Sequence, residues 1–519
     1  MTTKSTTSSS PSLAGTTGAA TTAGTTTRYA GTDRLLFGMI LGVLAFWLFA
    51  QTMLNIAPIM ARDLDVQMSV MNIAVSITSL FSGIFIVVMG GLADRIGRVK
   101  VVQWGFVLSI VGSLLVGFSP SGGALASVFL IAGRICQGLS GACIMPASLA
   151  LVKAYWAGAG RQRAISLWSI GSWGGSGFAA LFGGLMAANV GWRWIFFAAA
   201  AVSVIGMLMV RGTPESRMEA GRYKLDVRGI LTFMVAMIAL EVLATQGSRL
   251  GWASRPSLIL AAIVVAVGFA FFRVESGNPD AFVDFRLFRN ATYTGATLSN
   301  LLLNAVAGIM IVAMTLVQVG GGMSAQSAGL LTLGYAIAIV AFIRVGEKLL
   351  QRFGARKPML WGSLIVAATI LLLMPTNVML GTYKVLAVVA FTLFGIGLAF
   401  YATPSTDAAL SNLPDDQSGS GSGIYKMASS LGASFGVAIS AAIFTALSAN
   451  DSSVNWLDGV IAFVGRQDNV AVREAAFFAF GANLLMIIAA IVSIVLLVPK
   501  GRLRDEAAAL RKPPRDRDA

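Results

Sequence analysis

The chain has 519 residues, of which 56% are hydrophobic and only 12% are charged. It has no histidine, and its two cysteines, Cys136 and Cys143, lie too far apart along one apolar run for a disulfide, so histidine metal sites, histidine-based catalysis and a disulfide framework are excluded. The formal net charge of +15 leaves two classes of partner open, nucleic acid and an anionic membrane surface.

The chain begins with a polar tail and continues as a series of apolar runs. Residues 1–32 are rich in Ser, Thr, Gly and Ala, and they predict a disordered tail because they cannot bury enough apolar surface to fold. Each later apolar run is about as long as a helix that crosses a bilayer. The pattern predicts an all-α integral membrane protein with fourteen spans. These cover residues 35–60, 70–92, 101–118, 124–151, 164–189, 194–210, 230–245, 257–272, 293–317, 328–343, 359–375, 385–408, 423–447 and 475–498.

The loops between the predicted spans alternate in charge. Lys and Arg gather in every second loop, and the other loops hold only scattered bases. By the positive-inside rule the basic loops face the cytoplasm, and an even number of spans then places both termini there. This explains most of the positive charge, so we expect lipid and no nucleic acid as partner. The basic segments lie within residues 95–100, 153–163, 211–228, 273–289, 348–357 and 500–517.

A short repeat relates two parts of the chain. The string "DRIGRVK" (Asp94–Lys100) follows the second span, and "QRFGARK" (Gln351–Lys357) follows the second span of the last six. Two parallel halves are a recurring plan among transporters. We therefore expect two six-helix bundles with an inserted central helix pair. The predicted segments are a disordered cytoplasmic tail (1–32), an N-terminal bundle (33–212), the inserted pair with its loops (213–290), a C-terminal bundle (291–499) and a cytoplasmic tail (500–519).

The first copy of the repeat belongs to a longer and more specific string, "GGLADRIGRVK". By itself a basic loop beside a span is an ordinary topology anchor. The order of residues in this string, however, resembles the loop signature of the major facilitator superfamily, with Val99 where a base is usual. The resemblance implies that the loop takes part in a charge network that latches the two halves together. The matching residues are Gly90, Asp94, Arg95, Gly97 and Arg98.

Two further strings resemble elements of the same family. In the fourth span, "GRICQG" matches through Arg134, Gln137 and Gly138. In the fifth, "GSGFAALFGGL" is similar to the antiporter motif. The resemblance is to the fourteen-span drug:proton antiporter branch, and strings such as "GTPES", "YATPSTD" and "SGIYKMASSLG" are closest to its NorB-type quinolone-resistance exporters. The antiporter motif keeps Gly175, Gly183 and Gly184 but has Ser176 and Ala180 where prolines are usual.

Ionisable residues inside the spans are the predicted sites of proton coupling, because charge in hydrocarbon is costly. The resemblance implies that Arg134 takes part in coupling. The acid that this branch usually carries in the first span is absent, since Ala50 occupies its place. The remaining acids are Asp407, Glu241 and Glu474, and Asp407 is the first choice because it lies in a helix of the core bundle. Each of these acids has the alternative of being an ordinary interfacial or helix-end charge.

Polar residues in two spans are candidates for a substrate cavity, which needs apolar walls with a few polar groups. The same side chains could instead be polar ties between helices. The glycines of the fifth span predict close approach of backbones, which serves either a rocking interface or plain tight packing. The cavity candidates are Trp47, Gln51, Asn55, Asn300, Asn304 and Gln318.

The function expected from the sequence is secondary active export from the bacterial cytoplasmic membrane. The resemblance implies proton-coupled antiport of amphipathic organic compounds, such as quinolone-like drugs, dyes and quaternary ammonium compounds, by a monomer with no cofactor. An alternative is an exporter or facilitator of one endogenous metabolite or siderophore, without proton coupling. An enzyme is not expected, because the chain has no nucleophile–base set and no sizeable soluble domain.

Overall fold

The computed structural model describes residues 29–217, 226–278, 281, 283–448, 462–465 and 467–500. Regular structure within these residues is entirely helical, and eleven of the helices are long and apolar enough to cross a membrane. The predicted all-α membrane class is therefore confirmed, while the count of fourteen spans stays a prediction. The predicted tails lie outside the described residues, apart from residues 29–32 and 500.

The first bundle consists of long helices that are tied to one another at their ends. Thr32 caps the first helix by accepting a hydrogen bond from the Leu35 amide. At the other end of that helix, Asp63 accepts a hydrogen bond from the Trp192 indole and pairs with Arg193. The elements are α1 (Asp33–Asp63), α2 (Met68–Ile96), α3 (Arg98–Gly117), α4 (Gly123–Tyr155), α5 (Gly158–Ser169), the π-helical turn η1 (Ile170–Gly174), α6 (Gly175–Asn189) and α7 (Arg193–Val210).

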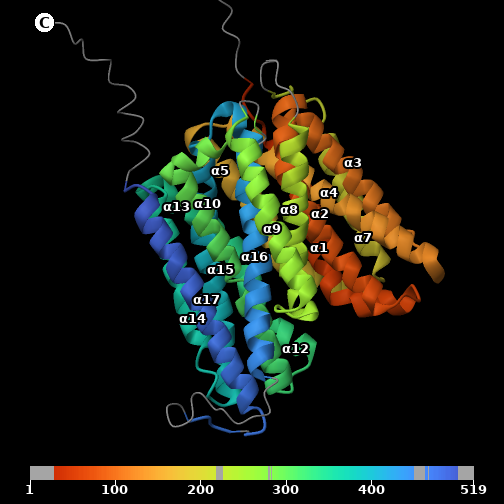
Figure 1. Cartoon of the computed structure of the whole chain (residues 1–519), viewed down its shortest axis with the longest axis vertical. Helices are drawn as coiled ribbons and strands as arrows, with labels where there is room; N and C mark the ends of the chain where they lie inside the picture. The colour runs from red at the N-terminus through yellow and green to blue at the C-terminus, as the bar shows by residue number, and fades with distance from the viewer. Residues whose placement is uncertain are drawn as a thin grey trace, which may run out of the picture.

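The second bundle has the same kind of architecture and lies beside the first (Figure 1). Its helices include two broken ones, in which a short helix or a π-helical turn continues the path of a longer helix. The elements are α10 (Ala291–Ala305), α11 (Gly308–Thr315), the π-helical turn η3 (Leu316–Gly320), α12 (Ala325–Leu330), α13 (Leu333–Phe353), α14 (Arg356–Leu373), α15 (Leu380–Ser411), the short 3-10 helix η4 (Asp415–Gln417), α16 (Ser418–Ser448) and α17 (Val470–Leu497).

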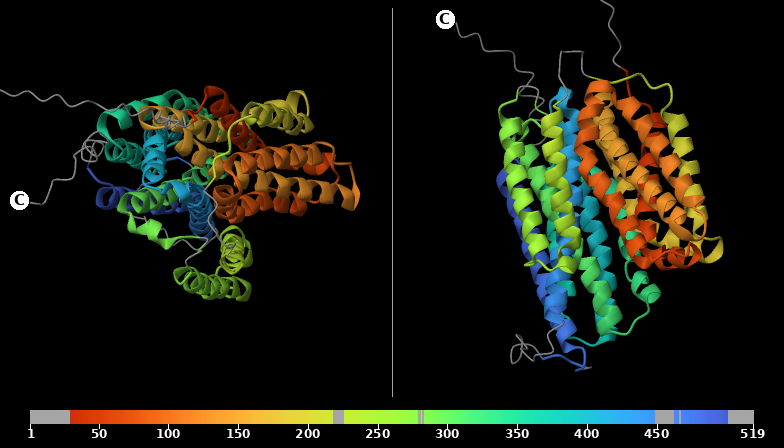
Figure 2. Two further views of the ribbon diagram at one scale, coloured as in Figure 1. Left: turned by 90° about the horizontal axis from the view of Figure 1, so that it is seen from above. Right: turned by 45° about the vertical axis from the view of Figure 1, so that its right-hand side comes forward.

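A helical hairpin stands between the two bundles in the chain and packs on their outside. It consists of α8 (Val227–Leu250) and α9 (Arg255–Ser276), followed by the 3-10 helix η2 (Phe285–Arg289). Asp226 caps α8 by accepting from the Gly229 amide. Helix α8 contacts both α2 and α16, and the hairpin is set apart from the other helices (Figure 2, left). Most of α9 is exposed, as expected for a helix that faces lipid.

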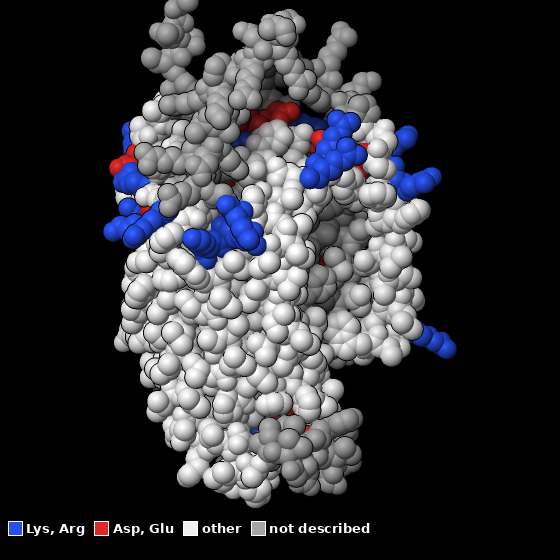
Figure 3. Space-filling view, turned by 90° about the vertical axis from the view of Figure 1, so that its left-hand side faces the viewer, with Lys and Arg blue, Asp and Glu red and all other residues white. Residues whose placement is uncertain are grey.

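Positive charge gathers at one end of the molecule. Figure 3 shows Lys and Arg side chains concentrated there, and few on the long apolar wall below. We call it the basic end; it carries the loops that follow α2, α4 and α13. The described chain both begins and ends at this end (Figure 1). The basic loops recognised in the sequence thus lie together at one end of the molecule. Which side of the membrane this end faces stays a prediction.

The sequence repeat occupies equivalent places in the two bundles. Gly97 directly follows α2 with φ of 125°, and Gly354 directly follows α13 with φ of 75°. Residues with side chains rarely adopt such positive φ values, so each copy needs its glycine to turn the chain into the next helix.

The two bundles meet closely at the basic end. A methyl group on Gly90 of α2 would lie 2.3 Å from the carbonyl oxygen of Gly419 of α16, and one on Gly419 would lie 2.2 Å from that of Gly90. Eight hydrogen bonds between the two bundles also lie at this end. We call this contact the seam.

Gly90→Ala tests whether the seam depends on this backbone contact. The added methyl should force α2 and α16 apart and destabilise the closed seam by about 1–3 kcal/mol, as overpacking does elsewhere. Electron resonance distances between spin labels at Lys100 and Asp416, in a background with Cys136 and Cys143 replaced by Ala, should become longer and broader. Gly481→Ala is the matched control, because a methyl there meets nothing within 4 Å. Unchanged distances in Gly90→Ala would contradict the expectation.

Candidate functional site

The centre of the seam is the carboxylate of Asp94, near the end of α2. Both of its oxygens accept hydrogen bonds from the Gly419 amide, at 2.8 Å each, and one also accepts from the Ser420 amide at 3.0 Å. These amides belong to the first turn of α16, so the negative charge lies at a helix N-terminus, where it is stabilised. Asp94 is 2% exposed. The carboxylate therefore links the two bundles through backbone groups.

Arg98 completes this contact from the same loop. Its Nη2 donates to Asp94 at 2.8 Å and to the carbonyl of Asp415 in the other bundle at 2.7 Å. Asp94 and Arg98, four residues apart, thus form an ion pair, and the arginine in addition reaches across the seam. Arg95 and Gly97, also predicted parts of the motif, lie between Asp94 and Arg98 in the chain, at the end of α2.

A short strap after α7 holds the loop from behind. The carboxylate of Glu215 accepts from the amides of Val99 at 2.8 Å and Lys100 at 3.1 Å, which caps α3. The Arg98 amide donates to the Ser216 carbonyl, and its guanidinium donates to the Ser216 hydroxyl. Sequence reasoning used "GTPES" only as part of the family resemblance and missed this role.

A second charged contact crosses the seam between α5 and α15. The carboxylate of Asp407 is 1% exposed and pairs with Arg161 at 3.0 Å, and the Gln162 amide donates to it at 3.4 Å. Arg161 also donates to the Ser411 hydroxyl at 2.6 Å. Sequence reasoning selected Asp407 but treated Arg161 only as a basic loop residue.

A third charged contact links the end of α4 to the segment before α16. Lys153 pairs with the carboxylate of Asp415 at 3.2 Å and also donates to the carbonyl of Leu413. We call the six residues of these three contacts the charged seam: Asp94, Arg98, Lys153, Arg161, Asp407 and Asp415.

Arg134 is buried inside the first bundle, away from the charged seam. It is 0% exposed and donates to the carbonyls of Ala74 at 2.9 Å and Phe49 at 3.0 Å, and to the Gln137 side chain at 2.8 Å. No carboxylate forms an ion pair with it among the described residues. Gly138 lets α4 approach α2, because a methyl there would lie 2.5 Å from the Thr78 carbonyl oxygen. The motif of α4 thus ties α1, α2 and α4 together, and its role in coupling stays a prediction.

Glu241 lies at the contact of the outer hairpin with the second bundle. It is 2% exposed, and its carboxylate accepts from the Ser434 hydroxyl of α16 at 3.0 Å. It is therefore far from Asp407 in the fold and cannot share a proton directly with the charged seam.

The glycines of the fifth predicted span mostly serve packing within the first bundle. A methyl on Gly183 would lie 2.0 Å from a methyl of Thr52 on α1, and one on Gly175 would lie 3.1 Å from Leu44, also on α1. Only Gly174 among the described glycines of this segment faces the other bundle, at Val340. Gly184 lies outside the described side chains. Directly before Gly175 the helix is interrupted by the π-helical turn η1, a local irregularity that often accompanies function.

The described cavity candidates lie in both bundles, and a shared cavity stays a prediction. Trp47 donates to Ser172 at 3.3 Å inside the first bundle. Asn300 donates to the Tyr425 carbonyl and the Ser429 hydroxyl and so ties α10 to α16, whereas Asn304 donates to Asn300 within α10. Gln318 lies in η3. The side chains of Gln51 and Asn55 lie outside the described residues.

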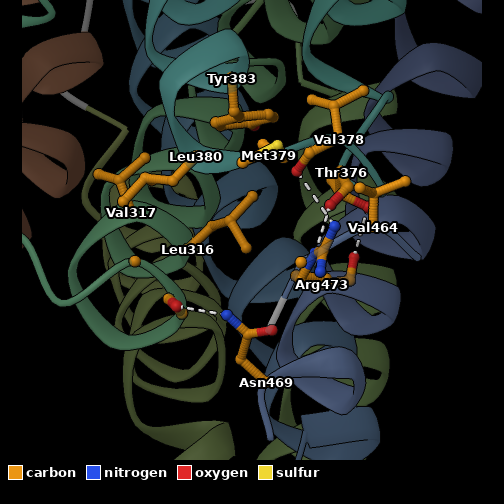
Figure 4. Close-up of a pocket in the computed structure, with 13 residues that line it drawn as sticks. Leu316, Val317, Thr376, Val378, Met379, Leu380, Tyr383, Val464, Asn469 and Arg473 are labelled. Atoms are coloured by element: carbon orange, nitrogen blue, oxygen red, sulfur yellow. Dashed lines mark hydrogen bonds between the residues drawn. The ribbon is translucent and has the colours of Figure 1, made fainter. Parts of the chain in front are cut away.

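A cavity of about 230 Å³ lies in the second bundle at the end opposite the basic end. Figure 4 shows Arg473 donating to backbone carbonyls of the neighbouring loop and Asn469 donating to Gly320. The remaining walls are mainly apolar, with Leu316 and Tyr383 among them. No predicted cavity residue lines it, and it does not touch the seam.

Comparisons with known proteins agree with this architecture. The family model of the Major Facilitator Superfamily matches residues 35–437 and 294–517. The quinolone resistance protein NorB of Staphylococcus aureus (strain MRSA252) is 43% identical over 473 residues, which cover 91% of this chain and 97% of NorB. The NorB of strain COL is equally similar, with 43% identity over 473 residues, 91% of this chain and 97% of that protein.

Solved structures share the fold at low sequence identity. The human organic anion transporter MFSD10 superposes with a TM-score of 0.60 at 14% identity, covering 89% of this chain and 98% of that chain. The proton:xylose symporter XylE superposes with a TM-score of 0.58 at 15% identity, covering 92% and 99%. This chain therefore belongs to the Major Facilitator Superfamily, and it is a membrane transporter and not an enzyme.

Proposed function

We propose that this protein is a multidrug exporter that exchanges amphipathic organic compounds for protons by alternating access. The observation that carries the proposal is the charged seam: three sets of charged contacts cross between the two bundles at the basic end. Buried charges are tolerated only while paired or solvated. Such a seam is stable in two states. In the closed state its ion pairs are formed, and in the open state its charged groups are hydrated.

The similarity to NorB supports a drug as the cargo. NorB is named for quinolone resistance, and its resemblance to this chain covers nearly the whole of both proteins. Quinolone-like drugs, dyes and quaternary ammonium compounds are therefore the first substrates to examine. We expect the transporter to act as a monomer without a cofactor, with the proton gradient as its source of energy.

The positive-inside rule assigns the basic end to the cytoplasmic side of a bacterial membrane, with both termini there. The closed seam then lies on the cytoplasmic side, and the arrangement corresponds to the outward-facing state of the cycle. Opening toward the cytoplasm requires all three charged contacts to break.

Asp407 is the residue that we propose to carry the proton. Its carboxylate is buried and is paired with Arg161 across the seam. When the seam opens, the pair is lost and water reaches both groups, so protonation becomes the alternative to pairing. Release of the proton would restore the pair and favour closure. Glu241 and Arg134 are less suited, because Glu241 accepts from Ser434 at the outer hairpin and Arg134 donates to groups inside the first bundle.

A second candidate function assumes the same fold but a different transport activity. The acid usual in the first span of proton antiporters is absent, with Ala50 in its place. This favours an exporter or facilitator of a single endogenous metabolite or siderophore that is not coupled to protons.

Efflux from proteoliposomes with and without a proton gradient separates these functions. We expect the gradient to drive export of a quinolone or of ethidium by the native protein. Asp407→Asn should lower the gradient-driven rate at least about tenfold, equivalent to about 1.4 kcal/mol. The reason is that the amide can neither bind and release a proton nor form an ion pair with Arg161. Asp416→Asn is the control, since Asp416 is an exposed acid in the short helix η4, which follows α15. Transport by the native protein that does not depend on the proton gradient would contradict antiport. Full gradient-driven activity of Asp407→Asn would exclude Asp407 as the proton carrier.

The two copies of the repeat should differ in importance. Asp94→Asn removes the charge at the N-terminus of α16 and leaves Arg98 without its carboxylate, so transport should fall at least about tenfold. Gln351, the matching residue in the second copy, donates only to Glu347 of its own helix at 3.2 Å. Gln351→Ala should therefore retain transport within about twofold, as for most exposed helix positions. Equal losses in the two variants, measured in the same efflux assay, would show that the loops are only topology anchors.

A further inference from the structure

Lys426 is a buried cation that the charged seam does not include. It lies on α16 about 12 Å along the helix from Ser418, and it is 8% exposed. Its ammonium lies 4.5 Å from the centre of the Trp168 ring on α5, in the other bundle. No hydrogen bond or ion pair of Lys426 is found among the described residues. The side chain thus crosses the seam to an aromatic ring and not to an acid.

The other buried cations set the contrast. Arg98 and Arg161 have carboxylates, and Arg134 has two carbonyls and an amide oxygen. An ammonium in a low-dielectric site normally needs an anion or several oxygens, and an aromatic face replaces them only in part. Lys426 therefore lies where a negative charge would be strongly attracted.

Unpartnered hydroxyls lie at the same depth as this lysine. The hydroxyl of Tyr425, the residue before Lys426, forms hydrogen bonds with the hydroxyls of Ser405 and Thr406 of α15 at 2.9 and 3.2 Å. Lys426 therefore lies at the same depth along the bundle as these two residues of α15. The hydroxyls of Thr403 on α15 and of Ser166 and Ser169 on α5 are buried and have no partner among the described residues.

The helical repeat places these hydroxyls next to the charged seam. Gln162 and Asp407 face each other across α5 and α15. Ser166 and Thr403 occupy the same two faces one turn further from the basic end. A set of donors therefore continues inward from the Asp407 pair toward Lys426.

We propose that Lys426 binds the carboxylate of the transported compound, with the neighbouring hydroxyls as additional donors. The inference rests on the proposed function, because the carboxylate that Lys426 would bind belongs to the exported compound. It adds a substrate class: organic anions and zwitterions that carry a carboxylate on an apolar frame. In the closed state Trp168 covers the ammonium; its indole is held in place by Ser148 at 2.9 Å. When the seam opens, the ammonium separates from the ring and the carboxylate takes its place.

Three probes, two of which share one molecular frame, test the site. Ciprofloxacin carries a carboxylate, its methyl ester does not, and ethidium is a cation without one. Efflux of each is measured from proteoliposomes with the native protein and with Lys426→Gln. We expect ciprofloxacin transport to fall at least about tenfold in Lys426→Gln, since a charge-assisted contact is lost. Transport of the ester and of ethidium should stay within about twofold, and Lys426→Arg should keep part of the ciprofloxacin activity.

Lys357→Gln is the control variant. Lys357 also lies over an aromatic ring, 5.4 Å from the centre of Phe353, but at the exposed surface of the basic end. It should not change the ratio of ciprofloxacin to ethidium transport. Thermal unfolding of Lys426→Gln should occur at the same or a higher temperature, because a buried charge without an acid partner has been removed.

The outcomes separate this inference from the proposed function. Equal loss of all three probes, or a marked drop in unfolding temperature, would show that Lys426 holds the seam together, and unchanged ciprofloxacin transport would show that it binds nothing; each result overturns the inference alone. Native protein that transports none of the three would overturn the proposed function, and the inference with it.

Discussion

Closure of the seam depends on one carboxylate at one helix N-terminus. Asp94 brings its charge from α2 to the first amides of α16, which are among the few backbone groups of a helix without partners in their own helix. Removed from water, that charge is stable only while these amides and Arg98 surround it. Gly90 and Gly419 allow the backbones to come close enough. The contacts of the Asp94 charge and the close packing of the two glycines thus require the same closed arrangement of the bundles. The other contacts across the seam can form because the Asp94 contact holds the bundles together.

The remaining charges divide into two groups by what they contact. Arg134 and Glu241 are satisfied within one bundle or at the outer hairpin, so they are indifferent to whether the seam is closed. Arg161, Asp407 and Lys426 have partners in the opposite bundle. Their environment changes completely when the bundles separate. A transporter needs a few groups of the second kind, because only such groups can make the energy of a conformational state depend on a proton or a bound compound.

Sequence reasoning recovered what is encoded locally. Spans follow from apolar runs, and the pairing of Asp94 with Arg98 follows from a spacing of one helical turn. Asp407 was found as an acid in a span, but Arg161 is 246 positions away, and no local pattern links them. Asn300 of α10 was predicted to line a cavity, and its hydrogen bonds join α10 to α16. Lys426 was overlooked because its significance comes from Trp168 on a different bundle.

The strap formed by Glu215 and Ser216 has a mechanical consequence. It fastens the chain that leaves the first bundle onto the loop between α2 and α3, where Arg98 also reaches the second bundle. The strap and loop therefore move as one body with the first bundle. When the second bundle moves away from the first, the strap can therefore stay intact, and of the contacts made by this loop only those to Asp415 and to the first turn of α16 have to break.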